Sequence, residues 1–183
     1  LRRFPGRAVG LGALGGFALY TAFPPLGWWP LAIPAVTAIT LACRGRSWRA
    51  GLLVGLAAGL AEFVPLVFWL HVVTPLAWIV LAIAQSLYLG ALGAGLAVLV
   101  GRLPGWQVWT ACAWVGEELI RSRWPLGGFG WGRLAFSQAD TPFTSYAAVA
   151  GAPLVTFAVA LCAALLASAT IAFAGVVRTP GAT

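Results

Sequence analysis

The chain has 183 residues, of which 61% are hydrophobic and only 8% are charged. Soluble domains carry about 25% charged residues, so this composition excludes an ordinary soluble protein, and the mean hydropathy of +0.94 indicates a protein embedded in lipid. The net charge of +7 comes from eleven arginines and four acidic residues. A basic balance can indicate nucleic-acid binding, but these arginines lie between long apolar runs, so we expect no nucleic-acid partner.

The cysteines and the single histidine do not form a pattern typical of a metal site. Cys43, Cys112 and Cys162 lie far apart in apolar sequence, and His71 has no companion at a metal-ligand spacing. We interpret the three cysteines as buried, unreactive thiols. The sequence therefore predicts no metal and no cofactor.

The first apolar stretch, residues 8–43, contains no charged residue and is too long for one span. As a single helix it would measure about 54 Å, against a hydrocarbon core of about 30 Å. Residues 23–30 (FPPLGWWP) combine helix-ending prolines with tryptophans typical of a membrane interface. Each half has about 15 residues, so either two short helices cross the membrane or a hairpin enters and returns. Both alternatives put the two ends of the stretch on the same side.

Four further spans are predicted, at residues 50–70, 76–100, 106–120 and 147–177. The expected fold is an all-α polytopic membrane helix bundle with about six spans, forming a single transmembrane domain over residues 1–183. With this count, eight arginines and no acid lie on one side of the membrane, and three arginines and three acids lie on the other. The positive-inside rule makes the eight-arginine side cytoplasmic. We therefore expect both ends of the chain in the cytoplasm and residues 121–146 outside it.

Small residues recur at intervals of about four in two of these spans, which predicts close helix–helix packing in lipid. They are Gly51, Gly55 and Gly59 in one span and Gly90, Ala94 and Ala97 in the next.

Glu62 lies in the middle of the span predicted at 50–70, where an ionisable group is costly and indicates a functional site by default. A transport or proton-relay role is one interpretation. The other is structural: a protonated Glu62 donates a hydrogen bond to Gln85, which lies at a similar depth in the next span. A relay needs further ionisable groups, and we expect none nearby, which favours the structural interpretation.

Residues 114–138 contain the densest set of candidate functional residues. Arg121 follows Glu117 by four positions and Glu118 by three, so either acid can share a helix face with it. At a membrane edge an arginine can also bind a phosphate or carboxylate. The glycines and tryptophans at 124–132 predict an irregular backbone with aromatic anchors. An interfacial aromatic belt and a lipid-binding site both fit this pattern.

Several motifs, taken in order, resemble bacterial apolipoprotein N-acyltransferases. They are FPPLGWWPLA at 23–32, FWLH at 68–71, ELIR at 118–121, GFGW at 128–131 and FSQ at 136–138. The resemblance implies the membrane part of an enzyme of the bacterial cytoplasmic (inner) membrane that moves an acyl chain from a phospholipid to a lipoprotein. The family's Glu, Lys and Cys triad belongs to a nitrilase-like domain. This chain has no lysine, so we assign no catalytic residue to it and expect it to be inactive alone.

The resemblance also implies a lipid-binding site and two lipid partners, phospholipid and lipoprotein. It places Arg121 and Trp131 near the bound lipids, with Glu118 orienting Arg121. Gly130 stands where the family usually has a proline, and Arg133 where it has a more neutral residue. Two other hypotheses stay open: a non-enzymatic membrane anchor for a polyprenol-phosphate mannosyltransferase, a glycosyltransferase partner, and a small transporter that depends on Glu62.

Overall fold

The computed structural model describes residues 5–178, which fold entirely into helices and connecting loops. The longer helices are α1 (Gly6–Ala22), α2 (Ala32–Cys43), α3 (Trp48–Leu66), α4 (Pro75–Leu99), α5 (Trp106–Arg121) and α6 (Ala147–Arg178). The short 3-10 helices are η1 (Trp29–Leu31), η2 (Phe68–Val72), η3 (Leu134–Gln138) and η4 (Pro142–Tyr146). The prediction of an all-α fold is confirmed.

Three helical stretches in this described part are long and apolar enough to cross a membrane: Trp48–Leu66, Pro75–Leu99 and Pro142–Val176. The helices α1, α2 and α5 have 17, 12 and 16 residues, fewer than the ~20 of a full span. The chain is thus a membrane helix bundle as predicted, and the count of six crossings stays a prediction.

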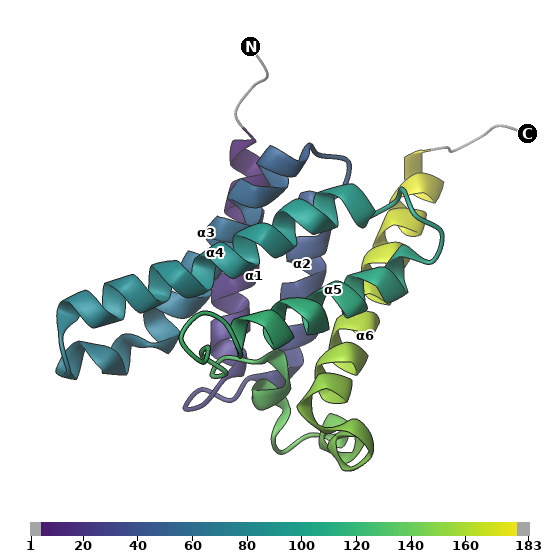
Figure 1. Ribbon diagram of the computed structural model, residues 1–183. Coiled ribbons are helices and arrows are strands. Elements are labelled where there is room, and N and C mark those ends of the chain that lie inside the picture. The colour runs from purple at the N-terminus through teal and green to yellow at the C-terminus, as the bar shows by residue number, and fades with distance from the viewer. Residues whose placement is uncertain (1–4, 179–183) are drawn as a thin grey trace, which may run out of the picture.

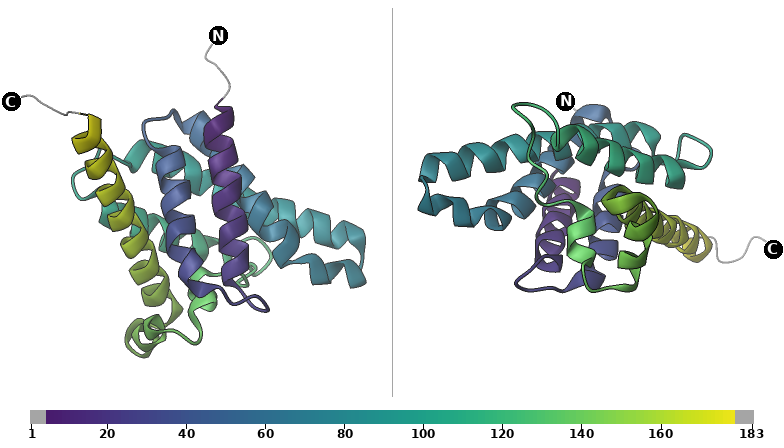
Figure 2. Two further views of the ribbon diagram at one scale, coloured as in Figure 1. Left: turned by 180° about the vertical axis from the view of Figure 1, so that it is seen from behind. Right: turned by 60° about the horizontal axis from the view of Figure 1, so that its bottom comes forward.

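Two groups of loops lie at opposite ends of the helix bundle. The N-terminal end of α1, the 44–47 loop and the C-terminal end of α6 lie together at one end, which we call the arginine end (Figure 1). The 23–31 loop and the outer segment, residues 122–146, lie at the other end (Figures 1 and 2). In Figure 2, α1, α2 and α6 run side by side, and the α3–α4 hairpin is tilted away from them.

The break predicted at residues 23–30 is present. Helix α1 ends at Ala22, and Phe23 is extended, with φ −84° and ψ 157°. The two prolines that follow cannot continue a helix because they lack the N–H donor. The span predicted at 147–177 also forms, but it bends at Ala150 and Gly151, whose backbone angles are not helical.

Glycines let α3 approach both α1 and α4 closely, as the small-residue pattern predicts. A Cβ atom added at Gly59 would lie 2.6 Å from the Cα of Ser86 in α4. Gly55 faces the backbone of Leu89 in the same way, and Gly16 of α1 faces the backbone of Ala58 in α3. These three helices are therefore held at distances that larger side chains would not permit.

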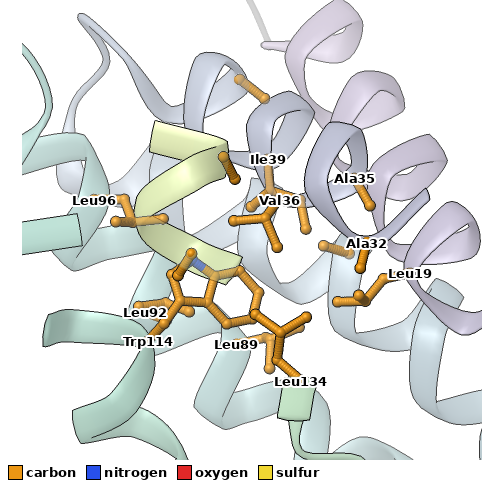
Figure 3. Packing of buried hydrophobic residues seen from close by; sticks show 14 of the residues in the cluster. Leu19, Ala32, Ala35, Val36, Ile39, Leu89, Leu92, Leu96, Trp114 and Leu134 are labelled. Carbon is orange, nitrogen blue, oxygen red and sulfur yellow. The ribbon is translucent and has the colours of Figure 1, made fainter. Parts of the chain in front are cut away.

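One hydrophobic core joins the helices. Trp114 of α5, Leu92 of α4 and Leu134 of η3 belong to the same buried cluster (Figure 3). Cys43 is buried, whereas Cys112 and Cys162 are exposed on the outside of α5 and α6. The prediction of three buried thiols is therefore wrong for two of them, because a thiol inside an apolar span can face the surrounding lipid as readily as the core.

Candidate functional site

Arg121, the last residue of α5, is buried at the start of the outer segment, with only 2% of its surface exposed. Its Nε donates a hydrogen bond to Oε1 of Glu117 at 2.6 Å. Nη1 donates to the carbonyl oxygen of Trp131 at 2.9 Å and to Oε1 of Gln85 at 3.4 Å, and Nη2 donates to the carbonyl oxygen of Gly132 at 3.2 Å. These groups form the Arg121 cluster, which joins α4, α5 and the outer segment.

The contacts of the Arg121 cluster indicate a structural role for Arg121. All three nitrogens of the guanidinium donate to acceptors of the chain, and the charge also lies 5.2 Å from the centre of the Phe63 ring. A lipid phosphate would have to displace these acceptors. In this structure Arg121 holds the backbone of the outer segment, and its expected position near bound lipids stays a prediction.

Glu118 makes a different set of contacts from the one expected. Its Oε1 accepts a hydrogen bond from the backbone N–H of Leu134 at 2.7 Å, and its Oε2 accepts one from Oγ1 of Thr156 at 2.8 Å. The same Thr156 hydroxyl accepts from the N–H of Ala135 at 3.3 Å. Glu117 is therefore the acid that hydrogen-bonds to Arg121, while Glu118 is engaged with η3 and α6. The expected role of Glu118 in orienting Arg121 stays a prediction.

A third polar residue joins the outer segment to the loop between α1 and α2. Gln138 is 1% exposed, and its Nε2 donates to the carbonyl oxygen of Trp29 at 3.4 Å. Its Oε1 accepts a hydrogen bond from Oγ1 of Thr141 at 3.3 Å. The two loops at this end of the bundle are thus connected by the side chain of Gln138.

An apolar groove lies next to the Arg121 cluster. We call it the Trp131 groove; its volume is about 430 Å³, and it is lined by Phe23, Pro24, Leu66, Val67, Trp69, Trp131, Gly132 and Phe136. Trp131 is 61% exposed, and its ring centre lies 5.3 Å from that of Trp69. The two carbonyl groups that Arg121 holds belong to Trp131 and Gly132. The Arg121 cluster therefore fixes one wall of the groove.

A second groove lies on the other side of η3. We call it the Ala152 groove; it measures about 380 Å³ and is lined by Ala135, Phe136, Gln138, Ala139, Thr144, Ala147, Ala152 and Val155. Phe136 lines both grooves. One end of the bundle thus offers two apolar grooves with one shared aromatic wall.

Glu62 does not donate to Gln85, whose carbonyl oxygen accepts from Arg121 instead. Glu62 is 2% exposed, and its Oε2 has no hydrogen-bond partner. Its charged neighbours are Arg121, Glu117 and Glu118. The expectation that no ionisable group lies near Glu62 is therefore also wrong, because the last turn of α5 lies close to the C-terminal part of α3.

The structure brings the three residues expected from the sequence, Arg121, Glu118 and Trp131, to the same end of the bundle. No role was expected for Thr156, and Gln138 and Gly132 were expected only as members of the FSQ motif and of the glycines at 124–132. The sequence feature that could have indicated such residues is polarity. Thr156 and Gln85 are polar residues in long apolar stretches, and such residues need a hydrogen-bond partner when buried.

Comparisons with known proteins agree with this architecture. Residues 15–165 match the family described as the apolipoprotein N-acyltransferase N-terminal domain. The chain is 42% identical over 150 residues to an apolipoprotein N-acyltransferase of Mycolicibacterium smegmatis, covering 80% of this chain and 25% of that protein. It is 32% identical over 180 residues to one of Pseudomonas paraeruginosa, covering 89% and 34%.

A third relative, from Vibrio cholerae, carries the same name and is 29% identical over 164 residues, covering 82% of this chain and 32% of that protein. The chain thus spans between a quarter and about a third of the length of these relatives. The family match covers most of the helices and the whole outer segment. This protein belongs to the apolipoprotein N-acyltransferase N-terminal domain family.

Proposed function

We propose that residues 1–183 form one membrane domain that seats a phospholipid and a diacylglyceryl-lipoprotein for N-acylation during lipoprotein maturation. The observation that carries the proposal is the Trp131 groove. Its walls are apolar and aromatic, which suits an acyl chain, and three of its lining residues, Trp131, Gly132 and Phe136, belong to the outer segment. Ligand sites are typically concave and mostly apolar with a few placed polar groups.

The second groove supports a domain that handles two lipids at once. Holding a reactant in place can lower a barrier by several kcal/mol, and an acyl transfer from one lipid to another has two lipid substrates to place. The Trp131 and Ala152 grooves share only Phe136. In the proposed arrangement each groove takes a chain of one substrate, with Phe136 between them.

The proposed orientation in the bacterial inner membrane has the arginine end in the cytoplasm and the outer segment on the extracytoplasmic side. The contact between Arg102 and the 44–47 loop supports it, since Nη2 of Arg102 donates to the carbonyl oxygen of Arg46 at 3.3 Å. Arginine-bearing loops that lie together fit the positive-inside rule. Arg2 and Arg3, which also belong to the predicted cytoplasmic side, lie outside the described residues.

The test is the acylation of a lipoprotein by the native full-length protein carrying Trp131→Ala. Removing this ring takes apolar surface from the groove, and we expect acylation to fall at least about tenfold. Trp124→Ala is the matched control, because Trp124 lies in the same segment with a similar exposure of 66% but does not line the groove. Equal acylation by the two variants would refute the assignment of the site.

The relatives described above are named for acyl transfer, which favours this function over an anchor for a glycosyltransferase. The anchor hypothesis places its function in the 44–49 loop at the arginine end and stays a prediction. Co-purification of a cytoplasmic glycosyltransferase, lost when the charges of that loop are exchanged, would support it.

A further inference from the structure

The outer segment and the end of α5 carry three arginines whose surroundings differ sharply. Arg121 is buried and satisfied by the Arg121 cluster. Arg123 is exposed, and its Nη1 donates to the carbonyl oxygen of Leu119 at 3.0 Å. Arg133 is half-buried and has no hydrogen-bond acceptor or acidic partner within residues 5–178, and its Nε is buried without a partner. A buried donor without an acceptor is costly, and most such groups in proteins are satisfied.

Arg133 lies at the edge of the Trp131 groove. Its guanidinium carbon is 6.0 Å from the centre of the Phe136 ring, which lines the groove, and it directly follows Gly132, another lining residue. The guanidinium also lies against Gly130, where an added Cβ atom would be 3.6 Å from Nη2 of Arg133. The structure thus places an unpaired positive charge beside an apolar groove.

We propose that Arg133 binds the phosphate of a glycerophospholipid whose acyl chain occupies the Trp131 groove. This inference rests on the proposed function and names the group that holds the headgroup. A guanidinium presents several N–H donors in a planar fork that matches phosphate oxygens. The phosphate supplies the acceptors that Arg133 lacks, and the apolar walls take the acyl chain. A glycerophospholipid joins both features in one molecule and belongs to the bilayer around a membrane domain.

We expect Arg121 and Arg133 to have different roles. Arg121 positions the wall of the groove through the carbonyl groups of Trp131 and Gly132, whereas Arg133 contacts the lipid. The two arginines should therefore respond differently to a ligand that lacks the phosphate, because only Arg133 has a partner to lose.

The experiment measures equilibrium binding of radiolabelled dipalmitoyl phosphatidylglycerol to the native full-length protein in neutral detergent. Arg133→Gln should weaken this binding at least about tenfold, the effect expected for a charged hydrogen bond. It should leave binding of dipalmitoylglycerol, which has the same chains and no phosphate, unchanged. Arg133→Lys should weaken phospholipid binding less than Arg133→Gln does, because it keeps the charge but loses the fork. Arg123→Gln is the matched control and should bind both lipids normally.

Three results would overturn the assignment of Arg133. The first is unchanged phospholipid binding by Arg133→Gln. The second is an equal loss of diacylglycerol binding, which would mean that the variant damages the groove. The third is displacement of the phospholipid by inorganic phosphate at the same concentration as the lipid, which would assign the site to free phosphate.

Trp131→Ala, measured in the same assay, separates this inference from the proposed function. If Trp131→Ala loses phospholipid binding and Arg133→Gln does not, only the role of Arg133 is refuted. If Trp131→Ala keeps full binding of both lipids, the groove itself is not the lipid site and the proposed function fails.

Discussion

Arg121 and Glu117 form an ion pair with 2.6 Å between Nε and Oε1, and both side chains are almost completely buried. The pair occupies the last turn of α5, where a positive charge also interacts favourably with the helix dipole. Because Arg121 holds two carbonyl groups of the outer segment as well, this one side chain connects the helix bundle to the Trp131 groove.

Replacing Arg121 with alanine should destabilise the protein. The change leaves Glu117 as an uncompensated buried charge, and breaking a buried pair typically costs about 3–5 kcal/mol. We expect a clear fall in the thermal unfolding temperature of the detergent-solubilised protein, together with loss of phospholipid binding. Arg123→Ala is the control, since Arg123 is exposed. If the two variants unfold at the same temperature, the Arg121 cluster does not hold the segment.

The choice between the two acids beside Arg121 shows what a sequence can and cannot predict here. Spacings of three and four residues both allow a pair on a helix, so Glu117 and Glu118 were equally acceptable partners. The choice depends on Leu134 and Thr156, which bring two donors to Glu118. Leu134 and Thr156 lie 16 and 38 positions after Glu118 in the chain. A local sequence pattern does not predict contacts over such separations.

Other features followed from local physics and were predictable. Prolines after Phe23 end α1 because they lack an N–H donor, and small residues in α3 mark a close helix contact. The tilt of the α3–α4 hairpin relative to its neighbours was not predictable in this way (Figure 2). That tilt decides which residues of α3 lie near the end of α5, and so it decides the neighbours of Glu62.

Glu62→Gln tests the transporter hypothesis. Glu62 is buried beside two other acids and one arginine, and its Oε2 lacks a hydrogen-bond partner. A neutral amide of the same shape avoids burying a carboxyl group that has no partner for Oε2, so we expect an unfolding temperature no lower than that of the unaltered protein. Lipoprotein acylation by the full-length protein should also be unchanged. Acylation that falls severalfold while stability is retained would instead give the carboxyl group of Glu62 a functional role.

Gly132 should tolerate no side chain, for two independent reasons. Its φ of +73° is rarely adopted by residues with a Cβ atom, and a Cβ atom there would lie 2.8 Å from Cε1 of Phe63 and 2.9 Å from Cδ2 of Leu66. Gly132→Ala should therefore shift the wall of the Trp131 groove, lower the unfolding temperature and weaken phospholipid binding.

Gly127→Ala separates the two reasons, because Gly127 has a φ of +89° but no atom within 4 Å of an added Cβ. It carries the backbone cost of about 1 kcal/mol without the clash. We expect Gly132→Ala to lose clearly more stability than Gly127→Ala and, unlike it, to lose lipid binding. Equal effects would mean that Phe63 and Leu66 move aside easily, and that the groove is not a preformed feature of the bundle.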